Sequence, residues 1–325
     1  MAPAVATGGG AGPRDGACLV HLVWAPLGPE PLARFLSSYR HHDAGAPHRL
    51  LVVFNGFGTQ DDLDPWRRLL AGVEHDELRL ARPVLDLAAY REVAERVEAE
   101  RYCFLNSYSE VLVDGWFAML DAALKAPDVG LVGATGSWAS TRSITIHFLR
   151  LPGPYRGVLP EPRVAMEGFM ALEADISGRQ PARSFPARMR ARLAGLHQVP
   201  QQTLPFESFP AYHVRTNAFM IGRDKLAELR LRPVRTKRDA YLLENGRRSI
   251  TRQLQRKGLR TVVVDREGAS YDPDRWHQSR TFWQGDQEGL LVADNQTRCY
   301  ADADAARRRL LSGFAWGPEA APTLP

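Results

Sequence analysis

The stretch that decides the fold reads Tyr102-Cys103-Phe104-Leu105-Asn106-Ser107-Tyr108-Ser109-Glu110. Its first four residues are mostly apolar and predict a buried strand, and small polar residues follow where that strand ends. Helix-like residues 112–125 come next. In open α/β sheets, nucleotides and their phosphates bind at the carboxyl ends of such strands. The stretch therefore predicts an α/β sheet with a ligand site at its polar loop.

Further strands and helices alternate on both sides of this stretch. The predicted strands are continuous apolar runs, which are typical of parallel strands covered on both faces: Ala17–Trp24, Arg49–Phe54, a shorter one at Glu77–Leu80, and Val129–Val132. Helices are predicted over Pro29–His41, Pro65–Ala71, Leu87–Glu100 and Leu112–Lys125. We therefore expect a mostly parallel central sheet flanked by helices.

The composition is that of a globular chain. It has 325 residues, of which 44% are hydrophobic, and this is enough to bury a substantial core. The net charge of +5 suits an anionic ligand, but no helix-turn-helix, zinc-finger or RNP-type motif accompanies it, so we expect no nucleic-acid binding. The three cysteines lack Cys-x-x-Cys spacing, and no apolar run approaches the ~20 residues that span a bilayer. A cytoplasmic protein is expected.

The second half of the chain is less regular. Prolines recur in residues 151–205, and five arginines without an acidic residue lie between Gly178 and His197. We interpret this region as an insertion with one basic helix over Ala187–Leu196. That helix is either a solvated face or a peripheral contact with a lipid surface or an anionic acceptor. Regular structure is predicted again over His213–Gly222, Ser249–Lys257, Thr261–Val264 and an Arg-rich helix that runs to Leu311.

The order of these pieces from Cys18 to about Gly268 resembles an inverting family 2 glycosyltransferase of the GT-A fold with a degenerate Asp-x-Asp motif. The matching pieces include Leu51–Gly56, Asp86 to Arg91, Phe104–Glu110, Val129–Gly136 and Glu244 to Gly258. The resemblance implies one GT-A-like domain over residues 17–317, between a disordered lead-in (1–16) and a frayed end (318–325). Within it we expect a nucleotide-binding half (17–150), the insertion (about 151–205) and an acceptor-side half (206–317).

The resemblance implies a nucleotide and donor site at the carboxyl edge of the sheet. Asn55 would contact the base, or else form a tight turn with Gly56. Asp86 would contact the base or ribose, or else cap the following helix. Arg91 would reach the diphosphate, or else lie on a helix surface. The remaining donor candidates are Asn106, Ser107, Tyr108, Gly136, Trp138, Arg275 and Arg280; for Gly136 and Trp138 the alternative is an ordinary turn with a buried tryptophan.

The same loop raises the question of a metal cofactor. In the resembling family, carboxylates at this position bind a divalent cation that neutralises the leaving diphosphate. Here Asn106 and Tyr108 stand where those carboxylates would be, and a neutral phenol is a poor ligand for Mg²⁺ or Mn²⁺. Glu110 and His277 are the remaining candidate ligands, and His277 is alternatively a surface or packing residue. We therefore expect weak dependence on Mg²⁺ or Mn²⁺.

Inverting transfer needs a base that deprotonates the acceptor hydroxyl. The resemblance places it in a Glu-Asp pair before a helix, where this chain has Glu244-Asn245. Glu244 is the first candidate and Asp239 the second; either could instead pair with neighbouring arginines. Polar residues also interrupt the predicted strand at 213–222, where a doubly covered strand would rarely hold them without partners. We interpret these as acceptor or sugar ligands: Arg215, Thr216 and Asn217.

These observations predict a glycosyltransferase of polysaccharide or glycoconjugate biosynthesis. It would move a sugar from a nucleotide-diphosphate donor to an acceptor hydroxyl. The expected partners are that donor and a glycan or small-molecule acceptor. The alternative is a sugar-nucleotide or glycan-binding protein of the same fold with weakened catalysis, and a homodimer is one possible assembly. A sugar-phosphate nucleotidyltransferase is disfavoured because its Gly-rich signature near the first strand is absent. Neither a Gly-x-Ser-x-Gly elbow nor a phosphate loop occurs, which disfavours a serine hydrolase and a P-loop enzyme.

Overall fold

A computed structural model describes residues 16–58, 63–177 and 203–320 of the chain. The expected basic helix over Ala187–Leu196 and nearly all of the expected lead-in lie outside these residues. Among the described residues, no helix is both long and apolar enough to cross a membrane. The predicted fold class is confirmed: helices flank a central sheet that is mixed and mostly parallel.

The central sheet joins eight strands of the described residues in the order β11-β10-β6-β9-β4-β1-β2-β3. Neighbours are parallel except at β9, which runs antiparallel to β4 and β6, and at β11, which runs antiparallel to β10. The strands are β1 (Ala17–Trp24), β2 (Arg49–Asn55), β3 (Asp76–Arg79), β4 (Arg101–Leu105), β6 (Val129–Gly133), β9 (Ala218–Gly222), β10 (Arg260–Val264) and β11 (Ser270–Tyr271). Two small antiparallel pairs join β5 (Glu110–Val111) to β12 (Val292–Ala293), and β7 (Gly136–Ser137) to β8 (His213–Val214).

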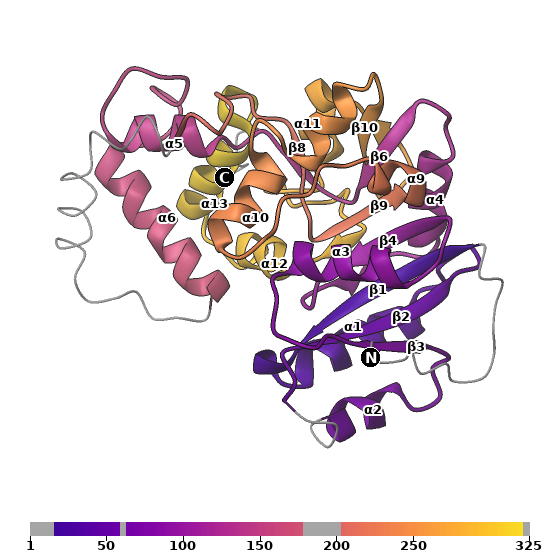
Figure 1. The fold of residues 1–325 in the computed structure, drawn as a ribbon. Helices are drawn as coiled ribbons and strands as arrows, with labels where there is room; N and C mark the ends of the chain where they lie inside the picture. Colours follow the sequence, from indigo (N-terminus) through magenta and orange to yellow (C-terminus); the bar gives the residue numbers. More distant parts are fainter. Residues whose placement is uncertain (1–15, 59–62, 178–202, 321–325) are drawn as a thin grey trace.

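The helices cover both faces of the sheet and gather beyond one end of it. Figure 1 shows α5, α6, α10, α12 and α13 together on the side of the molecule away from β3 and α2. The α-helices are α1 (Glu30–His41), α2 (Asp64–Leu70), α3 (Asp86–Arg96), α4 (Trp116–Leu124), α5 (Thr141–Phe148), α6 (Pro162–Ser177), α9 (Arg223–Ala227), α10 (Lys237–Asn245), α11 (Ile250–Gln255), α12 (Asn295–Ala301) and α13 (Ala305–Trp316). Short 3-10 helices are η1 (Ala25–Leu27), η4 (Pro273–Ser279) and η5 (Gly317–Glu319).

Alternate residues of each strand enter one of two hydrophobic cores. On β4, Tyr102 and Phe104 pack in the core that contains α3, whereas Cys103 and Leu105 pack in the core that contains α1 and α4. All four side chains have no solvent exposure. Both faces of the strand are therefore apolar, which explains why it reads as a continuous run and not as an alternating one.

Two expectations about local structure need correction. The predicted strand His213–Gly222 is two strands, β8 and β9, because residues 215–217 form a turn whose polar groups bond elsewhere in the chain. The predicted helix Leu112–Lys125 starts later, at Trp116, because β5 and a turn at Gly115 precede it. Gly115 has a φ of 74°, which a glycine adopts without strain.

Candidate active site at the carboxyl edge of the sheet

Several polar residues meet at one edge of the sheet. The parallel strands β1, β2, β4 and β6 all end there, and antiparallel β9 begins there. Asn55 ends β2, Asn106 follows β4, and Asn217 precedes β9. The edge therefore collects side chains from segments that are far apart in the sequence, as expected for a ligand site in an open α/β sheet.

Asn55 is completely buried and holds the segment that leads into α3. Its Nδ2 donates to the Val84 carbonyl oxygen at 2.8 Å, and its Oδ1 accepts from the Val84 amide at 3.1 Å. Both ends of the side-chain amide are thus used on one backbone unit. Asn55 acts in this structure by placing residue 84, two positions before Asp86.

Asn106 organises the loop after β4. Its Oδ1 accepts from the Tyr108 amide at 3.0 Å and from Ser109 Oγ at 3.1 Å. The backbone amide of Asn106 donates to the Asn217 carbonyl oxygen at 2.9 Å. Asn106 and Ser107 are buried, whereas Tyr108 is partly exposed. The loop therefore presents Tyr108, and the asparagine supplies its geometry.

Asp86 and Glu244 lie near each other at this edge. Asp86 is the first residue of α3, after the N-cap Leu85, and Glu244 lies in the last turn of α10. Desolvation chiefly raises the pKa of Asp86 to about 6, and the charge of Glu244 raises it further. The Asp86 side chain is nevertheless open to solvent. Water therefore reaches this carboxyl group, although the surrounding protein desolvates it in part.

Tyr108 lies beside this pair of carboxyl groups. Desolvation raises the pKa of its phenol, Asp86 raises it further, and Arg298 lowers it. The phenol therefore stays protonated at neutral pH and can donate a hydrogen bond. Because Asp86 and Arg298 both influence its pKa, Tyr108 lies near both of these residues.

Glu244 is oriented by Thr216. Its Oε1 accepts from the Thr216 amide at 3.0 Å and from Thr216 Oγ1 at 3.2 Å. Nearby, Tyr241 of α10 is 42% exposed, and Glu173 and Glu244 contribute to raising its pKa to about 12 after desolvation. The two hydrogen bonds fix the carboxylate with one oxygen engaged, so its Oε2 remains for a further interaction.

The turn before β9 contains Arg215, which has a structural role, and Asn217, which has an unsatisfied hydrogen-bond donor. Arg215 is buried, donates to Asp294 Oδ2 at 2.8 Å and to Thr135 Oγ1 at 3.3 Å, and stacks on Phe282. Asn217 accepts from Thr135 Oγ1 at 2.9 Å, but its Nδ2 has no partner among the described residues. The arginine contacts account for Arg215 as a link between this turn and α12, whereas Asn217 keeps a donor for a ligand.

The two candidate metal ligands are not assembled into a metal site. Glu110 pairs with Arg298 at 3.2 Å, and His277 lies on η4 in contact with the rings of Trp138 and Trp316. Within the described ranges, no group of three His, Cys, Asp or Glu side chains is placed to hold a metal ion. Divalent cations such as Mg²⁺ and Mn²⁺ prefer several hard oxygen ligands. The described residues therefore contain no preformed site with three such ligands for a divalent cation.

The structure places other expected site residues on the surface or in the core. Arg91 is a helix-surface residue that pairs with Glu95, Arg275 is exposed, and Arg280 pairs with Glu288. Trp138 is 6% exposed and packs against the rings of Phe209, Tyr212, His277 and Trp316, as in the alternative of a buried tryptophan.

Gly136 and Asp239 also have structural environments. A Cβ at Gly136 would lie 2.7 Å from the Trp276 ring and 2.8 Å from Val263, so the glycine allows close packing of β7 against η4. Asp239 closes a capping box with Thr236 at the start of α10. Its Oδ2 accepts from the Arg235 and Thr236 amides and from Thr236 Oγ1. This use of the carboxylate favours Glu244 over Asp239 as the base.

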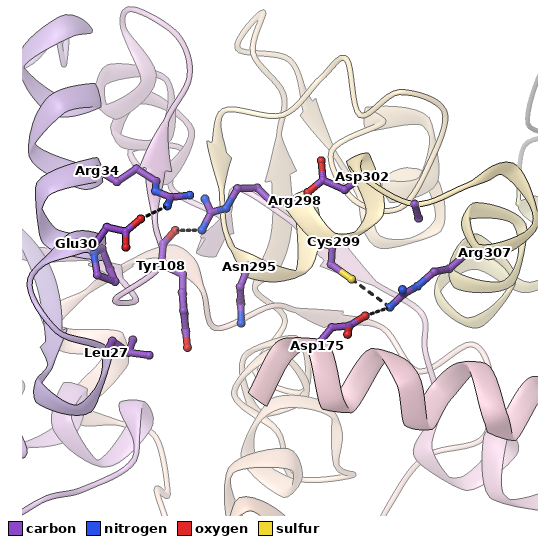
Figure 2. Close-up of a pocket in the computed structure, with 12 residues that line it drawn as sticks. Leu27, Glu30, Arg34, Tyr108, Asp175, Asn295, Arg298, Cys299, Asp302 and Arg307 are labelled. Carbon is purple, nitrogen blue, oxygen red and sulfur yellow. Dashed lines mark hydrogen bonds and ion pairs between the residues drawn. The ribbon is translucent and has the colours of Figure 1, made fainter. Parts of the chain in front are cut away.

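A pocket of about 460 Å³ at the same edge was not expected from the sequence. Tyr108 lines it, and Figure 2 shows other lining side chains coming from α1, α6, α12 and α13. The charged residues that line it are Glu30, Arg34, Asp175, Arg298, Asp302 and Arg307. In the sequence Arg34 and Arg298 have the spacing of ordinary helix-surface residues, and the one available signal was the polar Asp294–Thr297 motif that begins α12.

No protein-family model matches the chain, and no curated protein matches it either. Partial matches occur among solved structures. One is the mannosyltransferase PcManGT from Pyrobaculum calidifontis in complex with GDP-Man and Mn²⁺, at 16% identity and a TM-score of 0.29 over 36% of this chain and 34% of that one. Another is GalNAc-T7 with UDP, GalNAc and Mn²⁺, at 16% identity and a TM-score of 0.30 over 36% and 22%. Residues 1–349 of TarS from S. aureus match at 13% and 0.28, over 36% and 34%.

The first of these proteins is named a mannosyltransferase, whereas the names of the other two state no activity. The aligned parts span about a third or less of each neighbour. TM-scores this low carry no argument about the activity of this chain. The class that the structure itself defines is an α/β protein with a mixed, mostly parallel sheet and polar residues at its carboxyl edge.

Proposed function

We propose that this protein is a glycosyltransferase that moves a sugar from a nucleotide-diphosphate donor to an acceptor hydroxyl with inversion. The observation that carries the proposal is that Glu244 and Tyr108 both lie near Asp86 at the carboxyl edge of the sheet. The three come from separate strand-to-helix units of the chain. Their contacts support this reading independently of the partial matches to solved structures.

The proposed roles follow from the geometry of the acidic pair. Glu244 is the base: Thr216 fixes its Oε1, and its Oε2 receives the proton of the acceptor hydroxyl. The acceptor oxygen then forms a bond to the anomeric carbon while the bond from that carbon to the diphosphate breaks. The electron pair of the broken bond leaves with the nucleoside diphosphate. Asp86, placed by Asn55 through residue 84, contacts the nucleoside, and Asn217 offers its Nδ2 to the donor.

A second candidate function is supported by the engaged amides. Asn245 stands where the resemblance places the catalytic carboxylate, and the side chains of Asn55 and Asn106 are used to order the backbone. Such a site would bind a sugar nucleotide or glycan without transferring the sugar. Binding and turnover therefore have to be measured separately.

The first experiment is a calorimetric and thermal-shift panel of uridine, guanosine and thymidine diphosphates, with adenosine phosphates for comparison. A ligand that binds only the native state raises the melting temperature by mass action. We expect one nucleoside diphosphate to bind in preference to the adenosine phosphates. The matching nucleotide sugars are then tested for hydrolysis and transfer. Binding without any turnover supports the second candidate, and no binding across the whole panel contradicts both.

A further inference from the structure

The pocket beside Tyr108 contains two arginines that face each other from distant parts of the chain. Arg34 extends from α1, and Arg298 extends from α12 across the pocket (Figure 2). Desolvation chiefly lowers the pKa of Arg298, and the positive charge of Arg34 lowers it further, whereas Glu110, Asp294 and Asp302 raise it. The two guanidinium groups are therefore close enough to repel each other. An anion between them would relieve this repulsion.

Each guanidinium is held in place while keeping donors available. Arg298 donates to the Tyr108 carbonyl oxygen at 3.0 Å and to Glu110 at 3.2 Å. Arg34 pairs with Glu30 one helical turn earlier, at 3.1 Å, and is 43% exposed. A guanidinium has five N–H donors, so both residues retain several for a ligand. Two forks of this kind match the oxygens of phosphate groups.

The other charges of the pocket are placed differently. Arg307 pairs with Asp175 and also donates to Cys299 Sγ. Figure 2 shows these three residues at the end of the pocket away from Arg34 and Tyr108, with Asp302 on the same side as Cys299. The carboxylate beside the arginine pair is Glu30, which Arg34 already binds. The end next to the Tyr108 backbone therefore combines two guanidinium groups that are each paired with a carboxylate, Arg34 with Glu30 and Arg298 with Glu110. The Tyr108 ring extends away from them (Figure 2).

We propose that Arg34 and Arg298 bind the diphosphate of the donor, in the place of a divalent cation, in this pocket. The ligand class is a diphosphate, either free or esterified to a nucleoside. This proposal depends on the proposed function only for the identity of the group to which the diphosphate is attached.

The test measures inorganic pyrophosphate binding in excess chelator, with neither sugar nor acceptor present. Wild type, Arg34→Gln and Arg298→Gln are compared by calorimetry and by the shift in melting temperature. Each substitution removes charge-assisted hydrogen bonds and is expected to weaken binding about 10- to 100-fold. Arg163→Gln is the control, because Arg163 also pairs with a carboxylate one turn away, Glu167, but does not line the pocket. It should bind pyrophosphate as wild type does.

Arg298→Gln could also disturb the loop that it holds through Tyr108, so Arg34→Gln is the decisive variant. Arg34 is partly exposed and its ion-pair partner, Glu30, is on the same helix, so we expect its replacement to leave the fold intact. Equal affinity in wild type and Arg34→Gln overturns the proposal, as does the absence of pyrophosphate binding to wild type. If a nucleoside diphosphate still binds to Arg34→Gln unchanged, the donor site lies elsewhere and the proposed glycosyl transfer stands. Weakening of pyrophosphate and nucleoside diphosphate together supports the proposal.

Discussion

Two pairs of like-charged side chains lie near Tyr108, and they differ in sign. Asp86 and Glu244 are acidic, and desolvation together with the charge of Glu244 raises the pKa of Asp86. Arg34 and Arg298 are basic, and desolvation together with the charge of Arg34 lowers the pKa of Arg298. A transfer reaction needs both: a group that accepts the proton of the acceptor, and groups that stabilise the leaving diphosphate.

A third charged pair shows what a structural arrangement looks like in the same protein. Arg215 and Asp294 are opposite in charge, both buried, and 2.8 Å apart. Asp294 also caps α12 through Thr297, so its carboxylate is fully used. Opposite charges with complete hydrogen bonding need no ligand, whereas like charges at a solvent-accessible cleft do. The contrast separates residues that hold the fold from residues that remain for chemistry.

The largest expected effect comes from the acidic pair. Glu244→Gln keeps the shape of the side chain and can still accept from Thr216, but it cannot take the acceptor proton. We expect turnover to fall ~10²–10⁴-fold with nearly unchanged nucleotide affinity. Steady-state kinetics and calorimetry on the same preparation measure the two quantities.

Asp239→Asn serves as the control for the base. Because Asp239 caps α10, this change should lower the melting temperature and leave the rate per folded molecule near that of wild type. The reverse pattern, with Glu244→Gln changing only stability and Asp239→Asn abolishing turnover, would transfer the role of base to Asp239.

The buried opposite-charge pair should dominate stability. Asp294→Ala leaves the Arg215 guanidinium buried without its carboxylate and removes the cap of α12, so we expect a loss of about 3–5 kcal/mol in the free energy of unfolding. Urea denaturation gives this value. Arg34→Gln is the comparison, since an exposed pair within one helix contributes only about 0.3–0.5 kcal/mol. Similar losses for the two variants would contradict the distinction between structural and ligand-binding pairs.

The pH dependence of stability tests the environment of Asp86. Its pKa in the folded protein, about 6, lies above the ordinary value of 3.8, so the native state binds the proton more tightly than the unfolded state does. The stabilisation is fully present below the unfolded value and is lost as pH rises through 6. We therefore expect wild type to lose melting temperature relative to Asp86→Asn between pH 4 and pH 7.

The difference between the two proteins isolates Asp86 from other titrating groups. His21, for example, is buried with its pKa lowered to about 3, and it destabilises the native state as pH falls below 6.5. That contribution is common to wild type and variant and cancels. A constant difference in melting temperature from pH 4 to pH 7 would show that Asp86 does not titrate abnormally.

The smallest effect is expected from metal removal. If the arginine pair stabilises the diphosphate, excess chelator should lower the transfer rate only a few-fold, the ion being held mainly through the phosphates of the donor. Complete loss in chelator with recovery on adding Mn²⁺ would show that carboxylates such as Glu110 supply a metal site. If the arginine pair does stabilise the diphosphate, Arg34→Gln should make the transfer rate more sensitive to chelator than it is in wild type.

The sheet could be predicted from sequence far better than the site. Strand β1 has the bounds that its apolar run predicts, and β2, β4 and β6 differ from prediction by one residue at an end. Burial on both faces makes each of these strands a continuous apolar run, which is a local signal. Helix α6 was not expected, because it lies in a proline-containing region between two segments without clear periodicity.

The site depends on contacts that no local pattern contains. Sequence reasoning named Asp86, Tyr108 and Glu244, and the structure brings these together. It did not indicate Arg34 or Arg298, because each reads as one arginine on an amphipathic helix until the fold places α12 beside α1. It also could not show that Asn55 would bond to residue 84 or that Arg215 would find Asp294.

The bonds of Arg298 have a consequence for how this protein can be divided. Arg298 comes from the last part of the chain, yet it donates to the backbone of Tyr108 and pairs with Glu110, next to the strand pairing of β12 with β5. A fragment ending after β11 would keep every strand of the central sheet but would lose the bonds of Arg298 to the loop after β4. The two halves of this protein are therefore not separable modules, and a shortened version should bind its ligand only when residues of α12 are added back as part of the same chain.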